Sequence, residues 1–148
     1  MCDETEQFGR EAARELKVVS VDANPQLMGK KKEVVAVFEF VVQKSMCNML
    51  SILHGGCTAT IFDIATSLPI PLFMDYADDW LFTGITSSLS LNYFLPGIEG
   101  ERLRVVCTTK AGSKRTVTVV GELWSSRGLV ASAVHVKMAR SAGPQPKL

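Results

Sequence analysis

The sequence predicts an α+β fold in which one antiparallel sheet curves around a single central helix. Residues 55–68 form an apolar segment that is too long and too rich in Ala, Leu and Ile for a strand. Two β-branched segments precede this helix and four follow it, and the last three are joined by short turns typical of antiparallel neighbours. Because the helix is apolar on nearly all sides, it must be covered, and a strongly twisted sheet can curl around it.

The remaining elements follow in chain order. Phe8, Ala12 and Leu16 recur four apart among charged residues, which predicts a short amphipathic helix over residues 6–16. A brief strand is expected at 17–22. The segment 33–42 is β-branched and aromatic on both faces except at Glu39, and it is expected to form a strand largely buried on both sides. Further strands are predicted at residues 85–93, 102–110, 115–124 and 129–138, after which the tail at 140–148 is expected to be disordered.

Length and charge limit the classes of function. The 148 residues fit one domain, and 16 basic against 15 acidic residues provide no overall field for nucleic acid or an anionic membrane. The basic run at residues 30–32 is interpreted as a solvated turn. No membrane span is expected from the apolar stretch 46–74, because it contains Asp63, His54 and two prolines.

The cysteines and the acidic first residues indicate an intracellular protein, cytoplasmic or mitochondrial. A signal or transit peptide would begin with basic residues. The four cysteines show neither the paired spacing of a disulfide framework nor that of a zinc site. They are Cys2, Cys47, Cys57 and Cys107.

Asp63 is the one ionised side chain between Lys44 and Asp75. A carboxylate in an apolar segment costs folding free energy unless it is paired, hydrogen-bonded or facing a wet pocket. Just upstream, Gly55 and Gly56 would leave backbone N–H groups uncovered at the positive end of a helix, where an oxygen acquiring negative charge could be held. Each residue also has a structural alternative. Asp63 could be a helix carboxylate that is hydrogen-bonded only for structure, and Gly55 could be a small residue required where the helix meets the sheet.

The segment 48–63, from Asn48 through His54-Gly55-Gly56 to Asp63, resembles the Asn-x5-His-Gly-Gly-x6-Asp signature of the hotdog-fold acyl-CoA thioesterases. The nearest branch is the phenylacetate-pathway and acyl-CoA thioesterase 13 type. This resemblance implies cofactor-free and metal-free hydrolysis of an acyl-CoA to a carboxylic acid and CoA. It also implies a homodimer, with two dimers pairing into a tetramer.

The resemblance implies a role for each motif residue. Gly55 donates its N–H to the thioester carbonyl, and Asp63 orients or deprotonates the attacking water. Asn48 orients the His-Gly loop or the water, with a turn role as its alternative, and His54 positions the loop. Thr86 stands where this branch has a serine, and its hydroxyl can still hold a water.

Other residues are weaker candidates. Gly56 and Ser87 are expected substrate contacts, and Ser87 is also the alternative to Thr86 as the hydroxyl that holds the water. His135 lies on a regular strand without an evident partner and is interpreted as structural. Five cations are candidates for the CoA phosphates by charge alone. They are Lys110, Lys114, Arg115, Lys137 and Arg140.

Helix geometry predicts a site shared between two chains. Gly55 and Asp63 are eight residues apart, which is about 12 Å along one helix. One carbonyl and one water span far less, so an antiparallel partner helix would have to supply one of the two groups. The alternatives to a thioesterase are a non-catalytic acyl-CoA or lipid-binding hotdog module and a hotdog enoyl-CoA hydratase or dehydratase. The acyl group is not determined by the sequence.

Overall fold

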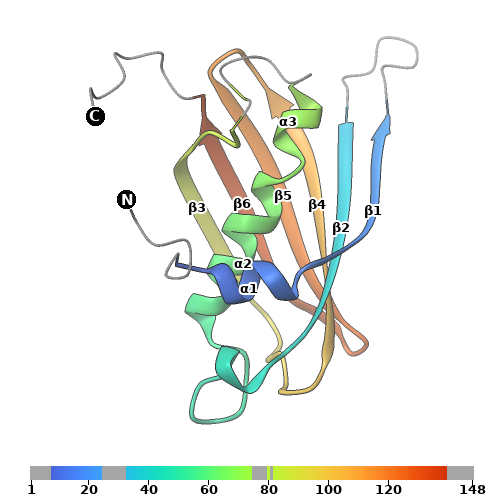
Figure 1. The fold of residues 1–148 in the computed structure, drawn as a ribbon, viewed down its shortest axis with the longest axis vertical. Helices are drawn as coiled ribbons and strands as arrows, with labels where there is room; N and C mark the ends of the chain where they lie inside the picture. The colour runs from blue at the N-terminus through green and yellow to red at the C-terminus, as the bar shows by residue number, and fades with distance from the viewer. Residues whose placement is uncertain (1–7, 25–32, 75–79, 81, 140–148) are drawn as a thin grey trace.

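The computed structural model describes residues 8–24, 33–74, 80 and 82–139 of the chain. Six antiparallel strands form one curved sheet in the spatial order β1-β2-β4-β5-β6-β3. The strands are β1 (Lys17–Asn24), β2 (Glu33–Val41), β3 (Ile85–Tyr93), β4 (Arg102–Gly112), β5 (Thr116–Ser125) and β6 (Gly128–Met138). The predicted curved sheet with a central helix, the hotdog arrangement, is confirmed (Figure 1).

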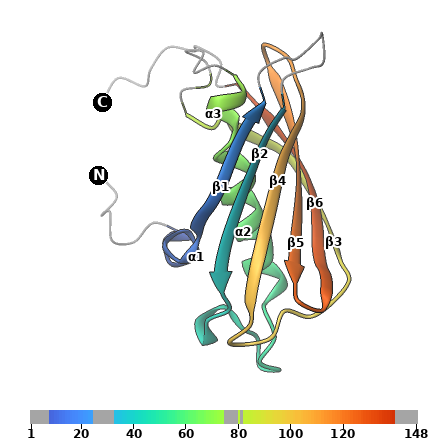
Figure 2. The ribbon, with the colours of Figure 1, turned by 90° about the vertical axis from the view of Figure 1, so that its right-hand side faces the viewer.

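The central helix α2 (Gly55–Ser67) runs along one face of the sheet, as the two views in Figures 1 and 2 show. It is followed after Pro69 by the short helix α3 (Ile70–Phe73). Ile61, Phe62 and Ala65 of α2 are buried in the core. Gly121 of β5 allows this close packing, because a Cβ there would lie 2.7 Å from the ring of Phe62.

The first helix is shorter than expected. Helix α1 spans Arg10–Glu15, whereas the sequence predicted residues 6–16, of which 6 and 7 lie outside the described residues. Gly9 precedes α1 with φ at 78°, in the left-handed region, so the helix cannot extend back through it. Phe8 is therefore outside the helix, and its side chain is exposed.

The prediction that β2 is buried on both faces is wrong. Its residues alternate between buried and half-buried side chains, because α1 and α2 cover the concave face of the sheet only. Several other predictions fall outside the described residues. They are the basic turn at 30–32, the tail at 140–148, Cys2 and Arg140.

Strand β3 lies at one edge of the sheet and pairs with β6 alone. Most of its side chains are exposed, including the large apolar residues Ile85 and Tyr93. Ser87 has no partner in the ladder, because the register with β6 shifts between Thr86 and Ser88. The outer edge of β3 is thus a long strand edge available for pairing.

The helical stretch Gly55–Phe73, with a mean hydropathy of 1.3 over its most apolar part, is long and apolar enough to cross a membrane. Core helices of soluble proteins satisfy the same criterion. In this chain the stretch packs against the sheet.

Candidate functional site

Three side chains from three elements meet beside the middle of α2. Thr86 Oγ1 of β3 lies 3.0 Å from Asp63 Oδ1 of α2 and 3.0 Å from His135 Nε2 of β6. The same His135 nitrogen lies 3.4 Å from Asp63 Oδ1. The interpretation of His135 as a residue without a partner is therefore wrong, because it closes a polar cluster around the Thr86 hydroxyl.

The opposite nitrogen of His135 faces Thr66 on the last turns of α2, with Nδ1 2.6 Å from Thr66 Oγ1. The Thr66 hydroxyl donates to the carbonyl oxygen of Phe62 at 2.5 Å. Because a carbonyl can only accept, Thr66 has no second hydrogen to offer and must accept from the imidazole. The geometry therefore assigns a proton to His135 Nδ1 and leaves Nε2 as the acceptor when the ring is neutral.

His135 is held neutral at physiological pH. Its side chain is fully buried, and burial lowers the pKa of His135 to about 4. This value already includes the Lys137 ammonium, which lowers the pKa in the same direction as burial, and the Asp63 carboxylate, which opposes both effects. The His135 ring is therefore neutral at physiological pH, with Nδ1 as a donor and Nε2 as an acceptor.

Lys137 lies two residues further along β6 and is also buried. Its Nζ donates to Ser67 Oγ at 2.7 Å, and Ser67 in turn donates to the carbonyl oxygen of Asp63 at 2.6 Å. Burial lowers the pKa of the Lys137 ammonium, an effect that the Asp63 carboxylate opposes. Lys137 is therefore not available on the surface for a CoA phosphate, and that prediction is wrong.

The expectation of a buried carboxylate at Asp63 is not met within one chain, since its side chain is 49% exposed. One carboxylate oxygen is turned toward Thr86 and His135, and Asp63 also lines a pocket of about 250 Å³ with Ala59, Thr60 and Leu89. Asp63 and the exposed Thr86 thus connect the buried His135 to an open surface.

The start of α2 forms a second polar group. His54 is the helix cap, and its Nδ1 accepts the N–H of Gly56 at 2.9 Å. The N–H of Gly55 has no acceptor among the described residues. The Gly55 N–H is therefore a backbone donor left open at the positive end of α2. Tyr93 at the end of β3 donates its hydroxyl to the carbonyl oxygen of Gly55 at 2.9 Å.

Asn48 shapes the loop that leads into this helix. Its Oδ1 accepts the N–H of Leu50 at 2.9 Å, and its own N–H donates to the carbonyl oxygen of Ile52 at 2.9 Å. The turn role considered for Asn48 is therefore present in the structure. Asn48 also lines a pocket of about 320 Å³ together with Gly55 and Tyr93.

The two glycines differ in what a side chain would meet. A Cβ at Gly55 would lie 3.5 Å from the Tyr93 hydroxyl, an ordinary contact, so packing within the chain does not require glycine there. A Cβ at Gly56 would lie 3.1 Å from His54 Nδ1 and would crowd the cap. The steric alternative for Gly55 is thus not supported, and close approach of a ligand remains as a reason for its small size.

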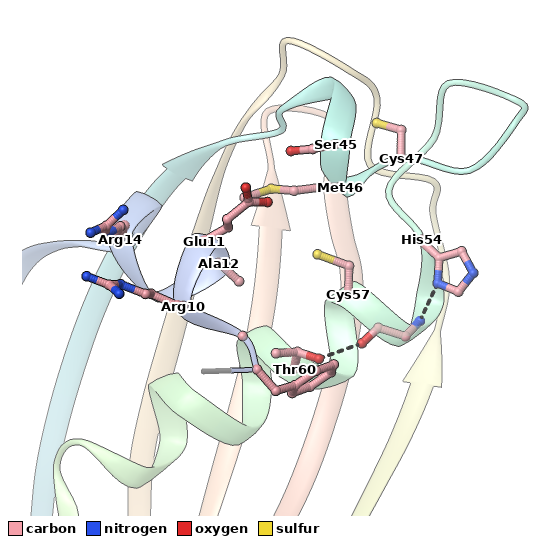
Figure 3. Close-up of a pocket in the computed structure, with 13 residues that line it drawn as sticks. Arg10, Glu11, Ala12, Arg14, Ser45, Met46, Cys47, His54, Cys57 and Thr60 are labelled. Atoms are coloured by element: carbon pink, nitrogen blue, oxygen red, sulfur yellow. Dashed lines mark hydrogen bonds between the residues drawn. The ribbon is translucent and has the colours of Figure 1, made fainter. Parts of the chain in front are cut away.

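The pocket with Asn48 and Gly55 and the pocket with Asp63 share no lining residue. A third pocket of about 740 Å³ lies between α1 and the first turns of α2 (Figure 3). Phe8 and Thr60 line both this pocket and the one with Asp63, so the two adjoin. Cys47, His54 and Cys57 also face the largest pocket, but no metal-binding group of three side chains occurs in the described part of the chain.

The remaining predicted contacts lie away from these pockets. Lys110 forms an exposed ion pair with Glu33 at 3.0 Å. Arg115 lies beside the turn between β4 and β5, and Ser87 is exposed on β3. None of the three lines the pocket of Gly55 or that of Asp63. Gly56 lines the largest pocket. The sequence does contain a signal for His135 and Lys137. They alternate along β6 in phase with the buried Ala133, whereas Val134 on the opposite face is exposed.

The comparisons of sequence and of structure with known proteins point to the same family. The model of the thioesterase superfamily matches residues 50–132. No curated protein matches the chain significantly in sequence. Zebra fish thioesterase superfamily member 2 has a similar structure, with a TM-score of 0.76, 19% identity, and coverage of 93% of this chain and 89% of that chain.

Two further solved structures show the same fold. Thioesterase superfamily member 2 from Mus musculus has a TM-score of 0.66 at 23% identity, over 88% of this chain and 87% of that chain. The E. coli PaaI protein from the phenylacetic acid degradation operon has a TM-score of 0.66 at 18% identity, over 87% and 86% of the two chains. At these identities the likeness supports the fold alone.

The buried neutral His135 predicts a loss of stability in acid. The unfolded chain binds a proton at His135 below a pKa of about 6.5, whereas the folded chain does so only below about 4. Between these values the unfolded state holds more protons, so the free energy of unfolding falls as the pH is lowered, by about 3 kcal/mol in total. Urea unfolding at pH 7 and pH 4 measures this loss.

The matched control is His135→Gln, which cannot titrate. It should lose about 3 kcal/mol less than the wild type over the same interval, because the carboxylates titrate in both proteins. An identical loss in the two proteins would show that His135 is not buried in its neutral form.

Proposed function

Because the chain belongs to the thioesterase superfamily, we propose that it hydrolyses an acyl-CoA thioester to a carboxylic acid and free CoA. The observation that carries this proposal is the Asp63–Thr86–His135 cluster, in which a half-exposed carboxylate is joined through a hydroxyl to a buried neutral imidazole. Such a group is suited to take a proton from water. A non-catalytic acyl-CoA-binding module would have no need of this arrangement.

Counting hydrogens shows how the cluster would accept a proton. The Thr86 hydroxyl has one hydrogen and two neighbours that can accept it, Asp63 Oδ1 and His135 Nε2, both at 3.0 Å. With Asp63 ionised and His135 neutral, one of these contacts therefore has no hydrogen. One added proton, on Asp63 or on His135, satisfies both contacts at once. The cluster is thus one proton short in its resting state and has a place for the proton of the attacking water.

The reaction then proceeds by ordinary acyl transfer. The water oxygen bonds to the thioester carbon while its proton moves to Asp63. The carbonyl oxygen becomes negative and is stabilised by the Gly55 N–H at the positive end of a helix. The oxyanion then re-forms the carbonyl as the carbon–sulfur bond breaks, and the CoA thiolate takes up the proton held on Asp63, which restores the carboxylate. The low pKa of His135 favours release of the proton from the cluster over its retention.

The two halves of this site come from two chains in our proposal. Gly55 and Asp63 lie on the same helix but line separate pockets. Asp63 is exposed on one side, and the edge strand β3, which carries Thr86, is unpaired on its outer side. A second copy lying antiparallel along this edge would bring the Gly55 of one chain toward the Asp63 of the other. The homodimer, and its pairing into a tetramer, is part of the proposal.

We also propose an intracellular location. Cys47, Cys57 and Cys107 are all unpaired in the structure. Burial raises the pKa of the Cys107 thiol to about 12, so this thiol is an inert core residue.

Asp63→Asn tests the proposed function directly. The amide has nearly the same size but cannot accept the proton of water, so kcat should fall by roughly 100-fold or more. The measurement is release of free thiol from a panel of aromatic, medium-chain and long-chain acyl-CoAs, which also identifies the acyl group.

Thr86→Ser is the matched control, because it keeps the hydroxyl of the cluster and should keep most of the activity. If a folded Asp63→Asn protein turned over at the wild-type rate, Asp63 would have no role as base. Absence of thiol release by the wild type across the whole panel would remove the proposed function itself.

The shared site predicts complementation between inactive chains. Asn48→Ala damages the site near Gly55, and Asp63→Ala damages the site at the base, so each homodimer should be inactive. In a mixed dimer one site carries both lesions and the other carries none. Random exchange of subunits in an equal mixture should therefore restore roughly a quarter of wild-type activity, measured as thiol release.

Subunit exchange must be verified separately, for example by mass spectrometry of differently labelled chains. Complete exchange without recovery of activity would place Asn48, Gly55 and Asp63 in one site within one chain.

A further inference from the structure

The peptide unit between Gly55 and Gly56 is held at both of its polar atoms. Tyr93 donates its phenolic hydroxyl to the carbonyl oxygen of Gly55 at 2.9 Å. On the other side of the same peptide, the Gly56 N–H donates to His54 Nδ1 at 2.9 Å, as the dashed line in Figure 3 shows. One side chain comes from the end of β3 and the other from the residue before α2. The peptide is clamped between a strand and a helix cap.

A clamp is needed at this point because two consecutive glycines have no side chains to restrict their backbone. Glycine is the most flexible residue, and the first turn of a helix lacks the internal hydrogen bonds that hold later turns. The free N–H of Gly55 belongs to the preceding peptide, and it shares the Gly55 Cα with the clamped one. Fixing the Gly55–Gly56 peptide therefore limits how far the Gly55 N–H can turn.

Tyr93 also links the two halves of the proposed chemistry. Strand β3 carries Thr86 at one end, bonded to Asp63, and Tyr93 at the other, bonded to Gly55. The strand thus runs antiparallel to α2 and touches it at both polar points. Tyr93 is 55% exposed and lines the pocket with Asn48 and Gly55. Because Tyr93 is exposed, neither core packing nor the need to satisfy a buried polar atom explains the hydrogen bond of its hydroxyl.

We propose that Tyr93 is a positioning residue that, together with His54, clamps the Gly55–Gly56 peptide so that the Gly55 N–H stays fixed as the donor to the substrate carbonyl. This inference rests on the proposed thioesterase function. Its effect is on the developing oxyanion and not on the affinity for the acyl-CoA, because Tyr93 acts through the backbone. A preorganised donor stabilises charge in the transition state without cost of reorganisation.

Tyr93→Phe removes the hydroxyl and keeps the ring. We expect kcat to fall about 10-fold with KM unchanged, since only a transition-state interaction is weakened. A second readout does not depend on activity. The Gly56 amide hydrogen, measured by NMR hydrogen exchange on the full-length protein, should exchange at least several-fold faster in Tyr93→Phe than in the wild type, because the Gly55 carbonyl stays in the α2 ladder but loses its contact with β3.

A double-mutant cycle with His54→Ala separates the clamp from two independent contributions. If both side chains hold one peptide, removing either releases it, so the double variant should lose little more kcat than one single variant. If the two side chains acted independently, the fold-loss of kcat in the double variant would equal the product of the two single fold-losses.

The outcomes distinguish the inference from the function on which it rests. Wild-type kcat in Tyr93→Phe, an unchanged Gly56 exchange rate, or multiplied losses in the cycle would each overturn the clamp while thioester hydrolysis stands. A wild type that hydrolyses no acyl-CoA would overturn the proposed function and the catalytic role of the clamp together, whereas faster Gly56 exchange in Tyr93→Phe would still establish the contact.

Discussion

The contact between Thr66 on α2 and His135 on β6 fixes the polar chemistry of this protein. The Thr66 hydroxyl is committed to the carbonyl of Phe62, so it accepts from the imidazole and determines which ring nitrogen is protonated. The other ring nitrogen must then accept, and it faces the Thr86 hydroxyl. The hydrogen bond between Thr66 and His135 thus sets the protonation pattern of the cluster that extends through Thr86 to the half-exposed Asp63.

The helix serves both ends of the proposed site. Asp63, Thr66 and Ser67 stand at positions i, i+3 and i+4, so they share the face that meets β3 and β6. At the other end of α2, His54 caps the Gly56 N–H and Tyr93 donates to the Gly55 carbonyl, while the Gly55 N–H has no acceptor among the described residues. Strand β3 contacts both ends. A rigid helix and one strand therefore hold the base and the oxyanion donor at a fixed separation, which a second chain would complement.

The fold could be predicted because its elements depend on local pattern. The apolar helix at residues 55–68 and the alternating strands after it are properties of short segments, and α2 ends one residue before the predicted limit. The helix at residues 6–16 was predicted too long, since periodicity does not reveal that Gly9 adopts a left-handed conformation. His135 and Lys137 were misjudged for a different reason. Their partners Thr66 and Ser67 lie about 70 residues away in sequence, and only the pairing of α2 with β6 brings them together. The motif led to Gly55 and Asp63, but the phenol of Tyr93 carries no signature in a strand.

In its resting state the Asp63–Thr86–His135 cluster is one proton short, with His135 neutral and protonated at Nδ1. The ¹⁵N chemical shifts of the His135 imidazole at pH 7 measure this state directly. The hydrogen bond from His135 to Thr66 predicts a protonated Nδ1 and an unprotonated Nε2, with the ring becoming cationic only near pH 4. A ring that is cationic at pH 7, or neutral with its proton on Nε2, would contradict it.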